Sequence, residues 1–327
     1  MPYPIEKKLV VAVSSRAVFD MESANDIFEK EGAEAYKKFQ AAHLDEPFVP
    51  GVAFPFVRRL LRLNELYPEQ QPIEVIVLSR NDPASGQRFY RSCRHHSLGI
   101  TRGAFLSGES PHPYIPAFNA SIFLSANQAD VLSAIQAGMP AGLVLPSKAA
   151  DDEKDHELRI AFDFDGVLID DQAEIVYKQS GSNLNLFFEH EKGKATIPHD
   201  PGPLKDLFTK IGFFQKLEAK RAAEQAGCRP AVRIAIVTAR NAPADERVVT
   251  TLASWGMSAT EVFFLGGIEK RRILEVMRPH IFFDDQLIHL ESAAATIPSV
   301  FIPFGVANSH LLKSLSRRGG SNVGSVR

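Results

Sequence analysis

The stretch LRIAFDFDGVLID, residues 158–170, gives the strongest indication of how the chain folds. It opens as an apolar run of strand length and ends in two carboxylates, Asp163 and Asp165, directly before Gly166. Residues two apart on an extended chain face the same side, so the side chains of both aspartates can reach the same site. Glycine then permits a tight exit from the strand. The pattern is typical of a strand end in an α/β fold, although taken alone it fits an acidic turn without chemistry equally well.

Similar text occurs near the N-terminus, where LVVAVSSRAVFD occupies residues 9–20 and aligns Ser14 with Asp163, an offset of 149. Three later blocks recur in the same order. VLSRNDP resembles VTARNAP at an offset of 160, and AFLSGES and ASIFLSAN resemble FFLGGIE and PHIFFDDQ at an offset of 159. Four blocks in one order indicate a duplicated unit, covering residues 8–148 and 157–310.

Each unit alternates apolar runs of strand length with helical stretches. This alternation predicts an α/β fold, with a parallel sheet in each of two tandem units and helices on both faces. Ligands in such sheets gather at the carboxyl ends of the strands. The charged stretch 146–157 predicts the boundary, with a first domain over 1–150 and a second over 157–310. The polar tail 316–327 is expected to be disordered.

Composition excludes several classes of protein. The 327 residues suit two domains, and a formal net charge of −2 argues against a broad nucleic-acid-binding surface. Cys93 and Cys228 are the only cysteines, which gives no disulfide framework and fits a reducing compartment. No stretch of membrane-spanning length is apolar. We expect a soluble, cytoplasmic protein that binds neither nucleic acid nor membrane.

Polar residues follow three more of the predicted strands. Thr238 can offer a hydroxyl to a phosphate oxygen, and Lys270 can neutralise developing phosphoryl charge. Asp284 and Asp285 can complete a metal site. Each has an ordinary reading as a strand-end threonine, a solvated lysine or a helix cap. Their shared placement at successive strand ends argues against all the ordinary readings together.

The aspartate pair suggests a specific chemistry. Carboxylate oxygens suit a hard cation, notably magnesium. One carboxylate can attack phosphorus while its neighbour protonates the leaving oxygen, which produces an aspartyl-phosphate intermediate.

DFDGV, the threonine of IVTAR, the downstream lysine and the paired aspartates resemble the four motifs of haloacid dehalogenase-type hydrolases. The resemblance implies Asp163 as nucleophile and Asp165 as general acid and then base, with Thr238 and Lys270 as phosphate ligands. It also implies magnesium held by Asp163, the main-chain carbonyl of Asp165 and Asp284, with Asp285 in support.

A closer similarity is to the cytosolic 5'-nucleotidase type I family. It is carried by AVSSRAVFD, PGVAFPFVRRLLRLN, LSRNDP, LGITRGAFLSG and FNASIFLSAN. This similarity implies magnesium-dependent hydrolysis of nucleoside 5'-monophosphates to nucleoside and phosphate. Two alternatives stay open: a phosphatase for another small phosphate ester, and a nucleotide-binding regulator with vestigial activity.

The first unit lacks the residues that the chemistry needs. Ser14 and Arg16 stand where the second unit has Asp163 and Asp165. The other alignments set Leu78 against Thr238, Pro111 against Lys270, and Ser125-Ala126 against Asp284-Asp285. We therefore expect a degenerate, catalytically dead unit, which could also serve as a pseudo-dimer partner of the active one. A homo-oligomer is also left open.

Two arginines suggest a use for the first unit. Arg16 and Arg80, with hydroxyl neighbours, could bind a phosphate without metal and form a regulatory site for a nucleotide effector. The resemblance favours this hypothesis, because enzymes of this type are associated with activation by nucleoside diphosphate. The alternative is that both arginines form structural salt bridges at a domain interface.

A mostly helical insertion at about 171–230 in the second unit is expected to form a cap that closes over the phosphate site. Phe187 and Phe188 are candidates to stack on a base, and Asn185 and Arg240 are further candidates for substrate contact. Core packing is the alternative for both phenylalanines. No histidine pair shows metal-ligand spacing, so loops or packing are expected for His190, His199 and His289.

Overall fold

The strands of both halves form one sheet. The computed structural model describes residues 3–179, 181, 183–224, 230–257 and 261–312. Within these ranges ten strands pair in the order β3-β2-β1-β4-β5-β10-β9-β6-β7-β8. The first half contributes β1 (Leu9–Val13), β2 (Ile73–Ser79), β3 (Arg102–Phe105), β4 (Ile122–Ser125) and β5 (Ala141–Val144). The second half contributes β6 (Leu158–Phe162), β7 (Val232–Thr238), β8 (Glu261–Phe264), β9 (Ile281–Asp284) and β10 (Ser299–Phe301).

Both halves have the same strand order when they are read outward from the middle of the sheet. Neighbouring strands are parallel except β5 and β10, which pair antiparallel and join the two halves. The predicted α/β class with a parallel sheet is confirmed in this mostly parallel form. Instead of two separate sheets, however, the structure has one continuous sheet.

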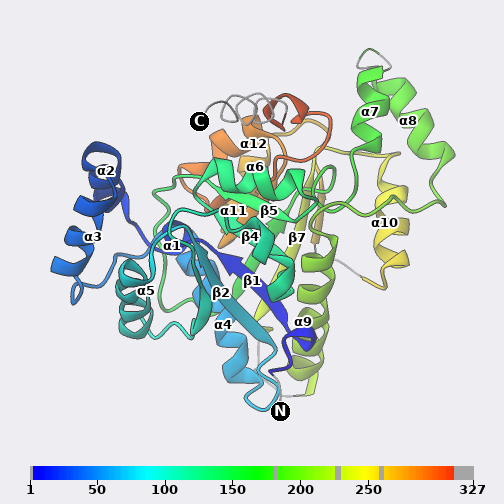
Figure 1. Ribbon diagram of the computed structural model, residues 1–327. Coiled ribbons are helices and arrows are strands. Elements are labelled where there is room, and N and C mark those ends of the chain that lie inside the picture. Colours follow the sequence, from blue (N-terminus) through cyan, green and yellow to red (C-terminus); the bar gives the residue numbers. More distant parts are fainter. Residues whose placement is uncertain (1–2, 180, 182, 225–229, 258–260, 313–327) are drawn as a thin grey trace.

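Helices cover both faces of the sheet (Figure 1). In the first half they are α1 (Ser15–Val18), α2 (Glu22–Glu31), α3 (Ala33–Ala42), α4 (Phe54–Leu66), α5 (Pro83–His95) and α6 (Gln128–Gln136), with short 3-10 turns at Ile5–Lys7, His112–Tyr114 and Pro116–Phe118. In the second half they are α7 (Gln172–Gln179), α8 (Leu184–Gly193), α9 (Lys205–Glu224), α10 (Asp245–Ser254), α11 (Lys270–Met277) and α12 (Leu287–Ala294).

Alternate strand residues pack on opposite faces, as the pleat of a strand requires. Val11 of β1 and Ile160 of β6 belong to one hydrophobic cluster that runs through both halves. Ala161 of β6 and Val10 of β1 face the other side, in two smaller clusters under α11 and α12 and under α6. Helix α4 also contacts β6, and α9 contacts β1. The two halves therefore share one core on the first face.

The insertion of the second half is smaller than the predicted 171–230. Helix α9 packs on β7, with Phe208 and Ile211 fully buried in the shared core, so it belongs to the layer that covers the sheet. Only α7 and α8 project from the sheet, and α2 and α3 project in the same way from the first half (Figure 1). An isolated β-bridge closes the base of each pair, Phe19 with Pro50 and Ile169 with Pro201.

Strand pairing corrects one alignment of the repeat. Thr238 pairs with Phe264 on β8, whereas Ser79 pairs with Phe105 on β3, so Thr238 corresponds to Ser79 at an offset of 159. The repeat in the sequence predicts Leu78 at this place, because the matching Arg-Asn letters after the strand shift the alignment by one residue. The first half therefore keeps a hydroxyl at this position.

The charged stretch 146–157 connects β5 to β6 and is tied to α4. Arg58 and Arg59 form ion pairs with Asp151 at 2.7 and 2.8 Å. The tail 316–327 lies outside the described residues. Within the described part of the chain, no helix has the length and apolar content needed to cross a bilayer.

Candidate active site

Three predicted site residues lie at one edge of the sheet because their strands are neighbours. Asp163 directly follows β6, Thr238 ends β7 and Asp284 ends β9, and β6 pairs in parallel with both β7 and β9. The carboxyl ends of parallel strands lie at the same edge of the sheet. All three side chains are buried there.

Lys270 joins this group from the first residue of α11. Its Nζ lies 2.9 Å from Oδ2 of Asp163 and 2.7 Å from Oδ2 of Asp284, and the lysine is 4% exposed. Burial alone would lower the pKa of Lys270, but the two carboxylates outweigh it and raise that pKa above its usual value. A buried ammonium thus lies between two carboxylates that are 121 residues apart in the sequence.

The carboxylates carry more negative charge than Lys270 can balance. Burial, together with the charges of Asp284 and Asp165, raises the pKa of Asp163 to about 7, although Lys270 opposes the shift. Burial and the charges of Asp163 and Asp284 raise the pKa of Asp285 to about 9. Burial would also raise the pKa of Asp284, but Lys270 and His289 hold it below its usual value. A further cation at this place would relieve the repulsion.

Asp285 provides the clearest sign of a missing partner. Its Oδ1 is buried and has no hydrogen-bond partner among the described residues. The carboxyl group lies against Gly166, where a Cβ atom would come within 2.5 Å of Oδ2, and Gly166 has a φ of +68°. Oxygen donors of this kind are those that magnesium prefers, so the residues fit such an ion.

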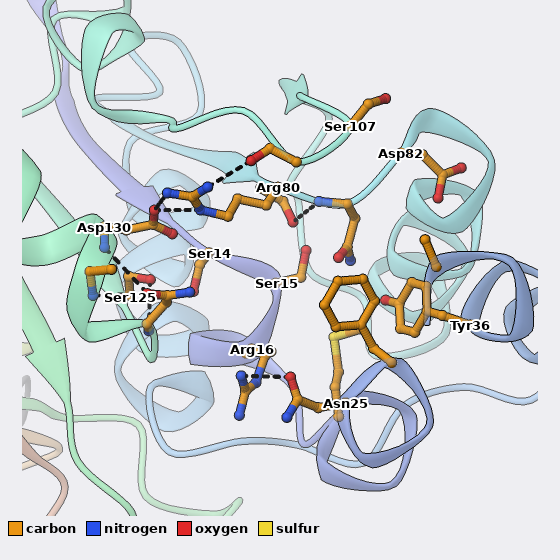
Figure 2. A pocket seen from close by; sticks show the side chains of 18 of the residues that line it. Ser14, Ser15, Arg16, Asn25, Tyr36, Arg80, Asp82, Ser107, Ser125 and Asp130 are labelled. Carbon is orange, nitrogen blue, oxygen red and sulfur yellow. Dashed lines mark hydrogen bonds and ion pairs between the residues drawn. The ribbon is translucent and has the colours of Figure 1, made fainter. Parts of the chain in front are cut away.

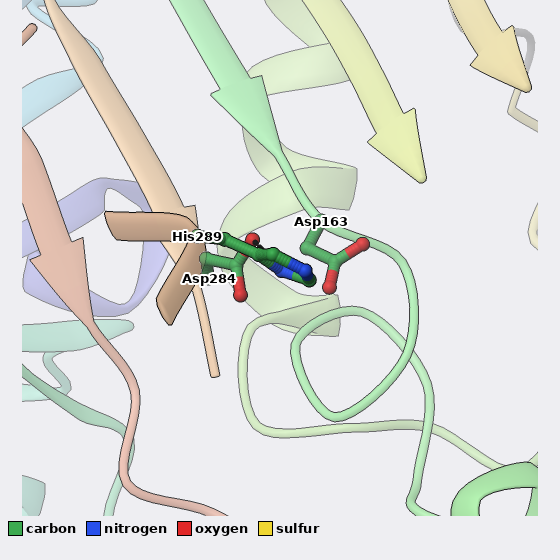
Figure 3. A group of neighbouring side chains, drawn as sticks. All are labelled: Asp163, Asp284 and His289. Carbon is green, nitrogen blue, oxygen red and sulfur yellow. Dashed lines mark ion pairs between the residues drawn. The ribbon is translucent and has the colours of Figure 1, made fainter. Parts of the chain in front are cut away.

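His289 belongs to the same group, which the sequence did not indicate. Its Nδ1 lies 3.3 Å from Oδ2 of Asp284. Asp163, Asp284 and His289 each offer an atom within 4.8 Å of the others, and Figure 3 shows the three side chains directed toward one another. The available signal was its place in the first turn of α12, directly after the aspartate pair.

The side chain of Asp165 is held by an arginine that follows the neighbouring strand β7. Arg240, two residues after β7, donates from Nε and Nη2 to Oδ2 and Oδ1 of Asp165, at 2.8 and 2.7 Å. Arg240 is 4% exposed, and its Nη1 forms a short ion pair with Glu191 of α8. Both carboxylate oxygens of Asp165 are therefore occupied by one guanidinium group.

Glu191 is the centre of a buried ionic cluster. It is fully buried and also pairs with Arg247 at 2.9 Å and with Nε2 of His199 at 3.1 Å. Burial would raise the pKa of Glu191, but His199 and Arg240 lower it to about 2. The projecting helix α8 is thus linked to Asp165 through Arg240.

Comparison with known proteins identifies the family. The sequence profile described as 5'-nucleotidase matches residues 1–309. The chain belongs to the 5'-nucleotidase family. One relative is "Cytosolic 5'-nucleotidase 1B" of Homo sapiens, which is 36% identical over 300 residues that make up 89% of this chain and 48% of the relative. The chain therefore spans about half the length of the curated relative it matches. No solved structure matches.

The remaining substrate candidates of this 5'-nucleotidase family member lie on α8. The guanidinium carbon of Arg240 is 5.6 Å from the ring centroid of Phe187, so Phe187 borders the group that holds Asp165. The ring centroids of Phe187 and Phe188 lie 5.7 Å apart, and both rings are half-buried. Asn185 is exposed in the first turn of α8, and no described contact brings its side chain to Asp163.

The two arginines predicted to bind a phosphate in the first half differ in their surroundings. Arg80 pairs with Asp130 at 2.6 Å and donates to the carbonyl oxygen of Gly108 at 2.6 Å, so a partner within the same half already balances its charge. Arg16 is exposed and donates to Oδ1 of Asn25 at 2.9 Å. The alternative of a structural ion pair therefore describes Arg80, and its partner Asp130 belongs to the same half of the chain.

Proposed function

We propose that this chain is a magnesium-dependent 5'-nucleotidase of the cytosolic type I group, within the haloacid dehalogenase-type superfamily. It hydrolyses nucleoside 5'-monophosphates to nucleoside and phosphate. One observation carries the proposal: Asp163, Lys270 and Asp284 form a single buried cluster at one sheet edge, in a member of the 5'-nucleotidase family. The name of the human relative supports a cytosolic location.

Asp163 is the proposed nucleophile, and its carboxylate is held at both oxygens. Oδ1 accepts a hydrogen bond from the backbone amide of Phe164 at 2.7 Å, and Oδ2 lies 2.9 Å from Lys270. Attack of an Asp163 oxygen on phosphorus forms the aspartyl-phosphate and breaks the bond to the leaving oxygen. Lys270 and the hydroxyl of Thr238 bind the phosphoryl oxygens as their charge develops.

Asp165 is the proposed general acid and base. It gives a proton to the leaving oxygen and later takes one from the water that hydrolyses the aspartyl-phosphate. Arg240 donates to both oxygens of Asp165 and so orients the carboxylate, while each oxygen keeps a second lone pair that can take a proton. Glu191 offers Arg240 a second anchor, so we assign positioning roles to Arg240 and Glu191.

Magnesium would be held by Asp163, the main-chain carbonyl of Asp165 and Asp284, with Asp285 in support. The raised pKa values of Asp163 and Asp285 and the unpartnered oxygen of Asp285 support this assignment. When bound, the ion supplies positive charge that stabilises the negative charge on the phosphoryl group.

We further propose that residues 157–310 form the catalytic unit and that the first unit, within 1–150, is a catalytically dead relative of it. The repeated strand order supports two units of one origin. In the dead unit Ser14, Arg16 and Ser125 take the places of Asp163, Asp165 and Asp284. We narrow the proposed cap to α7 and α8, because α9 packs on the sheet. A homo-oligomer stays a prediction.

Phosphate release from a panel of nucleoside and sugar monophosphates, with and without magnesium, tests the function. The proposal predicts release from nucleoside 5'-monophosphates that chelation of the metal abolishes. Preference for a sugar phosphate would favour the alternative of another phosphate ester. Absence of turnover on every ester would favour a nucleotide-binding regulator and contradict the proposed function.

A further inference from the structure

The first half contains a cavity of about 630 Å³ at the same sheet edge. Ser14 follows β1, Ser79 ends β2 and Ser125 ends β4, and all three line the cavity. Figure 2 shows Ser14 and Ser125 among the side chains around it. By strand register these are the places of Asp163, Thr238 and Asp284 in the second half. The dead unit has thus lost the carboxylates but keeps a cavity of ligand size.

We propose that this cavity is a second, noncatalytic site, which binds a small molecule that carries a phosphate group and a flat ring, without a metal ion. The nucleotide class has this chemistry. The proposal does not depend on the catalytic assignment of the second half.

The floor of the cavity offers hydroxyl protons to an anion. The Oγ atoms of Ser79 and Ser125 accept backbone amides at 3.2 and 3.1 Å, and that of Ser14 accepts two at 3.3 and 3.4 Å. Among the described residues none of these hydroxyls has an acceptor for its own proton. Ser15 is 2% exposed, and its Oγ has no hydrogen-bond partner in the described structure. Buried hydroxyls usually find a partner, so these groups indicate an anionic ligand.

The charge at the mouth is also favourable. Of the charged residues that line the cavity, Arg80 is balanced by Asp130, Lys37 pairs with Glu34 at 3.0 Å, and Asp82 caps the N-terminus of α5. Arg16 lines the cavity and has no carboxylate partner within the described residues. A guanidinium of this kind suits a phosphate.

The opposite wall is aromatic. Phe28 of α2 and Tyr36 of α3 line the cavity and pack edge to face, with ring centroids 5.9 Å apart and an interplanar angle of 85°. Tyr36 is labelled in Figure 2. Phe28 is 50% exposed although it is a large apolar side chain. Aromatic surfaces of this kind bind flat rings. The phosphate end and the ring end thus lie on different walls of one cavity.

Calorimetric titration of the full-length D163N chain with adenosine 5'-monophosphate in excess EDTA tests the proposal, because metal and turnover are both removed. We expect one binding event, which R16Q weakens by about tenfold to a hundredfold because a charge-assisted contact is lost. Inorganic phosphate serves as a second probe. Its binding should be weakened by R16Q but not by F28A. Arg16 and Phe28 are both exposed, so neither change disturbs the core.

Two outcomes of the titration would overturn the proposal. One is the absence of binding of adenosine 5'-monophosphate at millimolar concentration. The other is binding that R16Q and F28A leave unchanged but K270M removes, which would place the ligand in the second half. In the wild-type background with magnesium, R16Q should hydrolyse substrate normally. Loss of hydrolysis there would contradict a noncatalytic site.

Discussion

Replacing Glu191 by glutamine tests the link between the projecting helix α8 and Asp165. The substitution keeps the shape of the side chain but removes its charge from a fully buried position. In the folded chain the pKa of Glu191 is lowered from 4.5 to about 2. A lowered pKa means that the carboxylate stabilises the fold above pH 4.5, and that this stability is lost as the pH falls through about 2.

The size of the effect follows from that shift. A lowering of the pKa from 4.5 to about 2 corresponds to roughly 3 kcal/mol, which agrees with the usual cost of about 3–5 kcal/mol for removing one partner of a buried ion pair. We expect E191Q to lower the free energy of unfolding by about 3 kcal/mol at pH 7, as measured by urea denaturation. Because Arg240 loses an anchor, kcat for phosphate release should fall by about tenfold to a hundredfold.

The first half provides a matched control. Gln40 of α3 accepts from Arg88 at 3.1 Å, just as Glu191 accepts from Arg247, and Arg88 and Arg247 each also donate to a carbonyl oxygen at 2.9 Å. Q40E adds the charge that E191Q removes, and a buried ion pair close to break-even should change stability little. Activity should be unchanged. If E191Q unfolds like the wild type, or if Q40E loses as much stability as E191Q, the argument from buried charge is wrong.

Two further predictions concern the carboxylate cluster. The pKa values of Asp163 and Asp285 are raised from 3.8 to about 7 and about 9. The protonated carboxyl groups therefore contribute stability to the fold that is fully present below pH 3.8 and is lost as the pH rises through about 7 and about 9. The melting temperature in EDTA should therefore fall between pH 6 and 9 more steeply than in magnesium, and parallel curves would count against a metal site. G166A should abolish the rise in melting temperature on adding magnesium, because a Cβ would displace the carboxyl of Asp285. G256A is its control, since Gly256 has a similar φ of +64° and open space around it; an equal response of the two variants would refute the displacement.

Much of the site could be predicted because parallel strands make sequence position informative. An apolar run followed by a polar residue marks a strand end, and strand ends share one edge of the sheet. Asp163 and Asp284 come together for that reason, and Lys270 follows because it opens the helix after β8. Local sequence sufficed where the backbone alone positions the residue.

The residues that were missed depend on side chains and helix packing. Glu191 and His289 reach the site from helices, whose orientation is set by packing that the local sequence does not specify. The sequence places helix α9 in the cap, because its apolar positions suit a cap or a sheet-covering helix equally well. The register of Thr238 could not be derived from matching letters, because only the pairing of β7 with β8 fixes it.

The most direct test of the account asks whether the chain itself carries the phosphoryl group. Wild-type and D163N chains would be mixed with magnesium and a nucleoside 5'-monophosphate radiolabelled on phosphorus, quenched in acid within the first turnover, and counted for label on the protein. The account predicts acid-stable label on a peptide containing Asp163 in the wild type, and neither label nor turnover in D163N. Metal-dependent phosphate release that survives in a folded D163N chain would contradict it.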